Sequence, residues 1–515
     1  MAEHHRALIY VMTLGIPALF LAQIALRGVV EERELGIWRN AWIFSTLSFF
    51  LTGNVLIYAA SICALSLYIH RVSTAPIYLY LVLLLTAPAV GVNIGIPGVF
   101  GSIIELSPGR LLSLAFLLPA ATAIVRSKRE PGFSVTDRLV AGFLCLLIIL
   151  SMRHGSATYV MRACAVVLID IALPYVVFSR SLRSAESIRV GVAALIFAAL
   201  PFALAGMFEF ARGWRLYDAA IKEWDVFLIQ SYLFRDSMLR AAASTIEPIS
   251  FGFVCMVACG CFLAIRDRVS TRWAFPGAAL VLIGGLVAGL SRGPWLGMAV
   301  LIIVLAVVRR QGVLTLAKAS SIAALLCVPL LLSSLGDRIV RLLPFVGTVE
   351  TSNEDYRARL IEAAMAIIGR NPLFGSAEFR GEPEIVAMMQ GQGIVDIVNT
   401  YAAIGLEFGL VGLAIFIAIF ASVAPGLIRM CFSRTVEGNL LAQAMLATLV
   451  AILLTIGTVS SVTVIPYIYW AFLGMCTALL RVGVTAPLTT APLPLSRLRV
   501  LGQPPIFDHF EHRDR

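Results

Sequence analysis

The sequence predicts an all-α membrane protein that crosses the bilayer many times. Of its 515 residues, 59% are hydrophobic and only 14% are charged, and the mean hydropathy is +0.91. A soluble core does not account for this composition, because soluble domains keep about a quarter of their residues charged. The apolar residues also gather in runs of about twenty, the length that spans the hydrocarbon core as a helix.

Fourteen candidate spans follow one another along the chain. Their centres lie near residues 16, 56, 87, 118, 146, 168, 199, 256, 282, 301, 327, 411, 447 and 470. The last two share one uncharged run, 438–480, which we divide between Gly457 and Ser461. The first run has no convincing small-residue cleavage site before Arg27, so we interpret it as a retained span rather than a signal peptide.

Basic residues between the spans predict their orientation, because short cytoplasmic loops are enriched in Lys and Arg. With fourteen spans and both termini cytoplasmic, the basic clusters share the inner side: Arg126-Lys128-Arg129, Arg180-Arg183-Arg189, Arg266-Arg268-Arg272, Arg309-Arg310-Lys318 and Arg429-Arg434. The mixed-charge segments 27–39, 209–247 and 335–398 then lie outside. The proline-rich tail 482–515 is predicted to be a disordered cytoplasmic segment. The net charge of +10 fits anionic lipid and this topology better than nucleic acid, since the basic residues are scattered.

The motifs for several kinds of chemistry are missing from the sequence. We find no glycine-rich phosphate loop, HExxH, GxSxG or CxxC. None of the nine cysteines falls in a long polar loop, so neither a disulfide framework nor a metal-ligand cluster is indicated. Asp170 lies mid-span, where a carboxylate is usually paired or functional. We favour a structural pairing, with Arg162 as a candidate partner, over the proton site of a transporter.

Two long outer loops offer room for a site. The first, 209–247, is rich in aromatic residues, which either stack on sugars or form an interfacial belt: Trp214, Tyr217, Trp224, Phe227, Tyr232 and Phe234. The second contains "NEDYRARLIEAAMAIIGRNPLFG", which predicts a helix that begins at 353–355 and ends near Gly369 and Pro372. Its apolar stripe predicts a helix lying on the outer membrane surface or capping a cavity: Tyr356, Leu360, Ala364 and Ile367.

Arginines reach the outer side from three separate segments. "LRAAASTIEPISFG" carries Arg240 ahead of Glu247, "SRG" carries Arg292, and "DYRARLIEAA" carries Arg357 and Arg359. The loop around Arg292 is too short, and on the wrong side, to set topology, so a function is favoured over interfacial snorkelling. Guanidinium groups suit phosphate-rich ligands and stabilise charge that develops on a diphosphate leaving group.

Four motifs occur in a particular order over about 240–415. They are "RAAASTIEPISFG", "SRGPWLG" at the start of a span, "R...EAAMAIIGRNPLFG" in the outer loop, and "VNTYAAIGLEFGLVGL" opening the next span. In this order they resemble the O-antigen ligase and Wzy-type polysaccharide polymerase superfamily. The N-terminal half is similar only as a set of spans. We therefore divide the chain into a transmembrane bundle, 1–239, a ligase- or polymerase-like core, 240–481, and the tail, 482–515.

The resemblance implies a GT-C-like, all-helical glycosyltransferase of the bacterial inner membrane. It would transfer glycan from undecaprenyl diphosphate to an acceptor hydroxyl at the periplasmic face, without nucleotide sugar, cofactor or obligatory metal. By motif position, Arg292 and Arg357 would hold the diphosphate, with Arg240 a further contact. Asn399, Tyr401 and Glu407 match the motif that opens the next span, and Arg359 and Glu378 are further candidate substrate contacts.

One departure from the family separates polymerase from ligase. Ligases usually carry His-Asn where this chain has Val398-Asn399, and that histidine is thought to act on the acceptor hydroxyl. Its absence favours a polymerase; a base, if needed, would be a carboxylate, with Asp396, Glu378 and Glu247 as candidates.

Two rival functions stay open. One is a ligase with a lipid or protein acceptor, and the other is a transporter or flippase of lipid-linked glycan. A transporter would need polar residues through many spans and, often, symmetry between halves. The expected partners are the lipid-linked donor and acceptor, the bilayer, a chain-length regulator and a flippase, with no nucleic acid.

Overall fold

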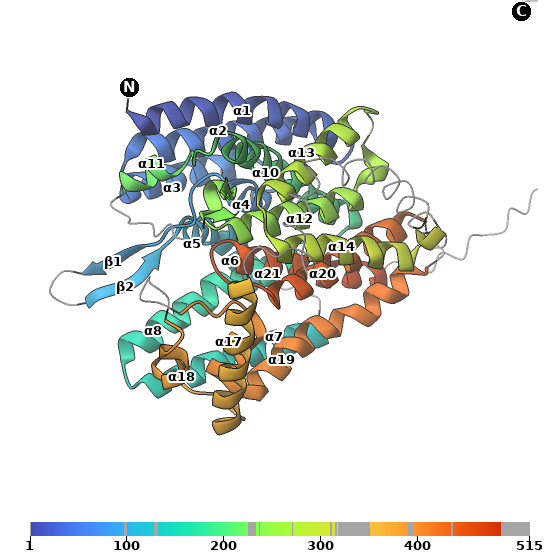
Figure 1. Cartoon of the computed structure of the whole chain (residues 1–515). Helices are drawn as coiled ribbons and strands as arrows, with labels where there is room; N and C mark the ends of the chain where they lie inside the picture. The colour runs from blue at the N-terminus through green and yellow to red at the C-terminus, as the bar shows by residue number, and fades with distance from the viewer. Residues whose placement is uncertain are drawn as a thin grey trace, which may run out of the picture.

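The computed structural model shows an almost entirely helical chain (Figure 1). It describes residues 2–96, 100–127, 132–224, 233–235, 237–269, 271–309, 312–314, 317, 351–389, 395–433 and 436–485. Its strands form two antiparallel hairpins, β1 (Val92–Ile96) with β2 (Phe100–Leu106), and β3 (Phe234–Arg235) with β4 (Met238–Leu239). The all-α prediction is confirmed. Several predicted features lie outside the described residues: the span near 327, parts of both long loops, the tail from 486, and Lys128, Arg129, Phe227, Tyr232, Arg310, Lys318 and Arg434.

Among the described residues, nine helical segments are long and apolar enough to cross a membrane, which makes this a multi-pass membrane protein. They are α1 (Glu3–Leu26), α3 (Val55–Val72), α5-η1-α6 (Pro108–Leu112, Ser113–Leu117, Leu118–Arg126), α7 (Val135–Ser151), α8-η3-α9 (Ala157–Val166, Val167–Ala172, Leu173–Ser181), α10 (Ala185–Arg212), α19 (Thr400–Cys431), α20 (Val436–Ile456) and α21 (Ile465–Thr485). Shorter apolar helices are α12 (Pro248–Ala264), α13 (Ala274–Ala288) and α14 (Arg292–Val308). The division of the run 438–480 is confirmed, because α20 ends and α21 begins on either side of 457–464.

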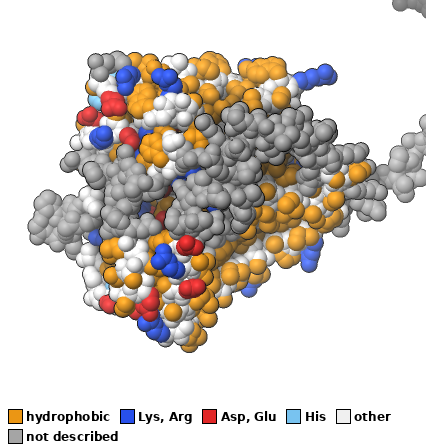
Figure 2. Space-filling model, viewed as in Figure 1, with side chains coloured by type: hydrophobic (Ala, Val, Ile, Leu, Met, Phe, Trp, Pro, Cys, Tyr) orange, Lys and Arg blue, Asp and Glu red, His pale blue; other side chains and the backbone are white. Residues whose placement is uncertain are grey.

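Helix α10 lies at the centre of the bundle and packs against α1, α4 (Ile77–Leu83), α12 and α13. Every residue from 191 to 203 is buried, so this helix touches protein on all sides. The flank of the bundle is different: Figure 2 shows hydrophobic side chains over much of it. Exposed examples on α14 and α19 are Ile302, Ile303, Val307, Ile417 and Ile428. An apolar surface of this kind fits contact with lipid.

Helix α17 (Thr351–Arg370) runs across the direction of the long helices (Figure 1). Its predicted apolar stripe is confirmed, since Leu360, Ala364 and Ile367 are each at most 2% exposed. They form a small separate core with Phe379 and Ile385, which follow in η6 (Phe379–Gly381) and α18 (Pro383–Val386). The outer segment thus has an apolar centre of its own.

Two predicted spans differ from the structure. The span near residue 56 is two helices, α2 (Glu32–Thr52) and α3, because Gly53 adopts φ 55° and the Asn54 side chain accepts hydrogen bonds from Leu56 N–H and Ile57 N–H. The span near residue 87 is instead the short helix α4 followed by the β1–β2 hairpin. There Ala89 N–H donates to the carbonyl of Ser244 rather than continuing a helix.

Because α2 and α3 take the place of one predicted span, α1 runs in the direction opposite to the predicted one. At its start, Glu3 accepts a hydrogen bond of 3.3 Å from the Trp214 indole, and His4 lies 3.3 Å from Glu223. Beyond its other end, Gly28 lies against the backbone of Arg268. The segment 27–39 therefore begins beside the basic cluster 266–272, whereas the sequence predicted these two segments on opposite sides.

The two ends of the described chain lie at opposite ends of the bundle. Arg481, near the end of α21, donates to the carbonyl of Ser179, beside the basic segment 180–189. The described chain therefore begins and ends at opposite ends of the bundle, whereas the sequence predicted both termini on one side. The charges of 32–39 had suggested a loop, but Glu34 is buried in α2 and its carboxylate accepts hydrogen bonds from Ser73 and Thr74.

We expect the N-terminus to face the side opposite the basic clusters. In intact cells, a cysteine introduced as Ala2→Cys should react with a membrane-impermeant maleimide, because it lies with the loop after α10. Asp267→Cys, in the basic turn after α12, is the matched control and should react only after permeabilisation. If Ala2→Cys is protected in intact cells as Asp267→Cys is, this topology is wrong.

Candidate functional site

Three turns pack together at one end of the bundle. They are 240–247 before α12, 289–291 between α13 and α14, and 457–464 between α20 and α21. The hydroxyl of Ser291 donates to the carbonyl of Pro248 over 3.0 Å, and the hydroxyl of Thr463 donates to Ser250 over 2.7 Å. Segments more than 200 residues apart in the sequence therefore form one surface.

Backbone strain is concentrated in these turns. Of the five described non-glycine residues with a positive φ, four lie in these turns: Ala243 (44°), Ile246 (60°), Leu290 (42°) and Thr463 (53°). Each such conformation costs about 1–3 kcal/mol and persists only where its surroundings impose it, which is why strained residues cluster at functional sites.

Glu209, near the end of α10, holds the first strained turn in place. Its side chain is fully buried and accepts hydrogen bonds from the backbone N–H groups of Leu216, Ala242 and Ala243, at 2.8 to 3.1 Å. Without this carboxylate, three backbone donors would lack their acceptor in a region shielded from water. Sequence analysis did not identify Glu209, because a carboxylate at the end of a span resembles an ordinary loop charge.

The structure brings the three arginine segments together. Arg240, only 8% exposed, donates a 2.9 Å hydrogen bond to the Ser291 hydroxyl, and Arg292 is the next residue. Arg357, from α17, donates to the carbonyl of Thr458 over 3.1 Å. Gly293 packs closely against Thr458, since a Cβ at this position would lie 2.5 Å from the Thr458 hydroxyl. We call Arg240, Arg292 and Arg357 the arginine cluster.

Two further arginines support the same turns, and sequence analysis missed both. Arg235, in β3, is 9% exposed and donates to the carbonyl of the strained Leu290. Arg215 donates to the carbonyl of Ile246 and lies 3.3 Å from Asp218. Their signal in the sequence was weak, since both lie in the loop whose aromatic residues suggested an interfacial belt.

Asp396 and Glu247 lie at the edge of this surface. The hydroxyl of Ser460 donates to the exposed carboxylate of Asp396, and the Tyr356 hydroxyl donates to its carbonyl over 3.2 Å. Burial raises the pKa of Tyr356, and the negative charge of Asp396 raises it further. Glu247 is half-buried directly before α12, and its carbonyl accepts a hydrogen bond from Thr245.

Asn399 and Tyr401 fix the start of α19 against the loop 457–464. The Asn399 side chain caps the helix by accepting from the N–H groups of Tyr401 and Ala402. The Tyr401 hydroxyl donates to the carbonyl of Leu453 over 2.8 Å, and the Thr400 hydroxyl donates to that of Val459. These contacts position the loop that Arg357 binds.

Helix α19 is interrupted at Gly409, where φ is 69° and ψ is −171°. The freed N–H groups of Leu410 and Val411 donate to the carbonyls of Pro372 and Leu373, over 2.8 and 3.2 Å. A Cβ on Gly409 would lie 2.4 Å from the Leu373 backbone, so this approach requires glycine. The "NPLFG" and "GLEFGLVG" motifs are therefore bonded to each other.

Three predicted substrate contacts lie outside the arginine cluster. Arg359 is exposed, and its Nε–H donates to Asp355 O on its own helix. Glu378 is exposed directly before η6. Glu407 lies about two turns into α19, where its carbonyl accepts from Arg153.

The buried charge at Asp170 has a partner from another span. Arg110 Nη2 lies 2.9 Å from Asp170 Oδ2, and the Tyr467 hydroxyl donates to Oδ1 over 3.1 Å. The pairing role is thus confirmed, but the choice of Arg162 as partner is wrong.

These features define a class: a multi-pass, all-helical membrane protein with strained turns and buried arginines gathered at one end of its bundle. Residues 277–417 match the family model described as O-antigen ligase, which confirms the resemblance to the ligase and Wzy-type superfamily. The matched segment includes Arg292, Arg357 and the Gly409 interruption, but not Arg240 or the Arg110–Asp170 pair. Among curated proteins, no match to the chain is found.

Proposed function

We propose that the protein is a polymerase that joins undecaprenyl-diphosphate-linked oligosaccharide repeats at the periplasmic face of the bacterial inner membrane. The product would be an O-antigen, capsule or exopolysaccharide. The observation that carries the proposal is the meeting of Arg240, Arg292 and Arg357 around Ser291 and Thr458, within and beside the segment that matches the family model. That match supports function of the ligase and polymerase type in general.

The chemistry assigned to the arginine cluster is stabilisation of a leaving group. The acceptor hydroxyl attacks the anomeric carbon of the donor glycan, and the bond from that carbon to the diphosphate oxygen breaks. Negative charge grows on the diphosphate as it leaves, and guanidinium groups facing it lower the barrier because they are already in place. The attacking hydroxyl loses its proton.

Asp396 is the carboxylate we favour for accepting that proton. Asp396 is exposed, and its carboxylate accepts a hydrogen bond from the Ser460 hydroxyl. Ser460 lies two residues after Thr458, whose carbonyl accepts a hydrogen bond from Arg357. A carboxylate within reach of the hydroxyl can accept the proton late in the transfer. Glu247 is the second candidate, because it ends the same turn, 240–247, that Arg240 begins. Glu378 lies elsewhere, beside η6.

The histidines favour a polymerase over a ligase. Among the described residues, His4 contacts Glu223 and the ring of His5, His70 contacts Ser66, and the ring of His154 lies tilted against that of Tyr159. The ligase-type histidine position is Val398. A ligase with a lipid or protein acceptor is the second candidate, favoured by the description of the matching family. The transporter hypothesis loses its main support, because Asp170 is paired with Arg110.

An in vitro assay tests the proposal. Purified protein is mixed with a lipid-diphosphate-linked repeat, without nucleotide and with a metal chelator, and the glycans are separated on a gel. A ladder of products is expected. Transfer that occurs only after a lipid or protein acceptor is added would show a ligase, and no transfer to any acceptor would reject glycosyl transfer. In cells, a flippase would supply the repeats and a chain-length regulator would act on the product.

A further inference from the structure

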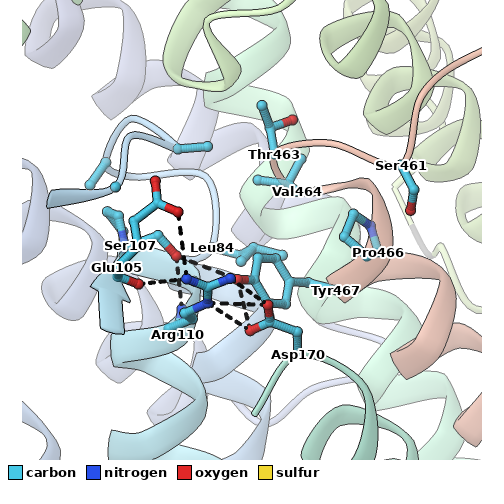
Figure 3. Close-up of a pocket in the computed structure, with 15 residues that line it drawn as sticks. Leu84, Glu105, Ser107, Arg110, Asp170, Ser461, Thr463, Val464, Pro466 and Tyr467 are labelled. Atoms are coloured by element: carbon cyan, nitrogen blue, oxygen red, sulfur yellow. Dashed lines mark hydrogen bonds and ion pairs between the residues drawn. The ribbon is translucent and has the colours of Figure 1, made fainter. Parts of the chain in front are cut away.

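A pocket of about 190 Å³ lies beside the loop 457–464 (Figure 3). Its walls come from four places: the segment after α4, the end of β2 with the start of α5, η3, and the loop leading into α21. A volume of this size admits several water molecules. This is the scale of one sugar ring.

The charged groups of this pocket differ in sign from the arginine cluster. The Arg110 guanidinium lies between two carboxylates: Asp170 at 2.9 Å and Glu105 at 3.7 Å, with the Glu105 side chain 53% exposed. With all three groups ionised, the wall has a net negative charge. Such a wall repels a diphosphate, whereas carboxylate oxygens accept hydrogen bonds from hydroxyl groups.

The rest of the lining is mixed. Hydroxyls come from Ser107, Ser461, Thr463 and Tyr467, and apolar surface comes from Pro108, Val464 and Pro466. Figure 3 shows Arg110 between Glu105 and Asp170, with Ser461 and Thr463 on the opposite side of the pocket. Small-molecule sites typically have an apolar wall with a few precisely positioned polar groups. A sugar ring has hydroxyl groups and apolar C–H surface, and the hydroxyls and apolar side chains of this pocket match both.

Two backbone features indicate more than a structural ion pair. Asp170 lies within the π-helical segment η3, and a second such segment, η1, follows Arg110 in its own span. π-Helical turns are rare and occur frequently at functional sites. Thr463, in the opposite wall, has a strained φ of 53°.

The pocket adjoins the turns that carry the arginine cluster. Ala89, in its wall, donates its N–H to Ser244, four residues after Arg240. On the other side, Ser461 and Thr463 follow Thr458, the acceptor for Arg357. A molecule in the pocket would therefore lie next to one held by the arginines.

We propose that this pocket binds an uncharged sugar ring of the acceptor repeat. The inference rests on the proposed function, since a polymerase must hold two lipid-linked substrates at the same face. The arginine cluster suits the diphosphate of the donor, and the carboxylates and hydroxyls around Arg110 suit the hydroxyl groups of the acceptor. Neither Arg110, Asp170 nor Glu105 lies in the segment that matches the family model.

Binding of a soluble probe tests this inference. The probe is the repeat oligosaccharide released by mild acid from the lipid carrier of the bacterium that encodes this chain, and its Kd for the purified full-length protein is measured by calorimetry. Glu105→Gln removes one hydrogen-bonding charge, and Ala89→Leu fills the pocket. Each should raise the Kd about tenfold or more. The matched controls are Glu31→Gln and Ala157→Leu. They change exposed residues outside the pocket and should leave the Kd unchanged.

In the polymerisation assay, the same pocket variants should raise the KM for the released repeat as acceptor and leave the KM for the lipid-linked donor unchanged. A Kd that is unaltered in both pocket variants would overturn the inference, as would failure of the wild-type protein to bind the repeat. Pocket-dependent binding without any ladder would keep this site and reject the polymerase. A ladder together with unaltered binding in both pocket variants would support the polymerase and reject this pocket as the acceptor site.

Discussion

Arg292→Ala should abolish polymer formation while leaving the protein folded in the membrane. Arg292 directly follows Ser291, which binds Arg240, and adjoins Gly293, which packs on Thr458. Removing one preorganised donor to developing charge typically lowers kcat about 100- to 1000-fold. Arg292→Lys should recover only part of this loss, because an ammonium group lacks the planar fork that matches phosphate oxygens. The measurement is the rate of ladder formation by purified protein.

The matched control for this substitution is Arg212→Ala. Arg212 is exposed at the end of α10, which lies at the same end of the bundle, so its loss removes a positive charge without touching the arginine cluster. Polymer length and yield should stay at the wild-type level. If Arg292→Ala behaves like Arg212→Ala, the arginine cluster does not hold the diphosphate.

Asp137→Asn should destabilise the fold by about 3–5 kcal/mol, the usual cost of breaking a buried ion pair from one side. The Asp137 side chain is 3% exposed, accepts from Tyr175 over 2.7 Å and from Arg180 over 3.3 Å, and pairs with Arg481. The substitution keeps the shape of the side chain and removes the negative charge that both guanidinium groups face. Because the cluster joins α7, α9 and α21, its loss loosens three spans together.

The effect should appear as a lower midpoint of denaturant-induced unfolding in detergent, followed by tryptophan fluorescence. Asp267→Asn is the matched control, since this carboxylate is exposed in the turn after α12 and its change should leave the midpoint where it was. An equal midpoint for Asp137→Asn and Asp267→Asn would show that the cluster contributes little to stability.

The arginine cluster could be anticipated from the sequence, whereas its supporting contacts could not. A cation at the end of an apolar run, as in Arg292, is visible because charge is rare there. Arg240 and Arg357 reach this region by donating to the Ser291 hydroxyl and the Thr458 carbonyl. Nothing in the linear sequence marks a serine hydroxyl or a backbone carbonyl as such an acceptor. The burial of Glu209 is hidden in the same way, because its three partners are backbone amides.

The error over α2 has a similar cause. A hydropathy count penalises Glu34 as a charge facing lipid, but in the fold this carboxylate is capped by Ser73 and Thr74 from the end of α3. Sequence spacing likewise suggested Arg162 for Asp170, whereas the partner, Arg110, lies 60 residues away. Local rules therefore located most of the described spans and the unusual charges, and tertiary contacts decided which charges the protein could bury.

The interruption of α19 has a consequence for how the chain is made. Two amides of this helix, at Leu410 and Val411, are satisfied by Pro372 and Leu373 rather than by the helix itself. In hydrocarbon an unsatisfied amide costs several kcal/mol. The ribosome synthesises 372–373 before α19, so the acceptors already exist when the helix leaves the translocon. A defect in this segment should therefore appear during biogenesis, as failed insertion and proteolysis, before it could appear as an inactive enzyme.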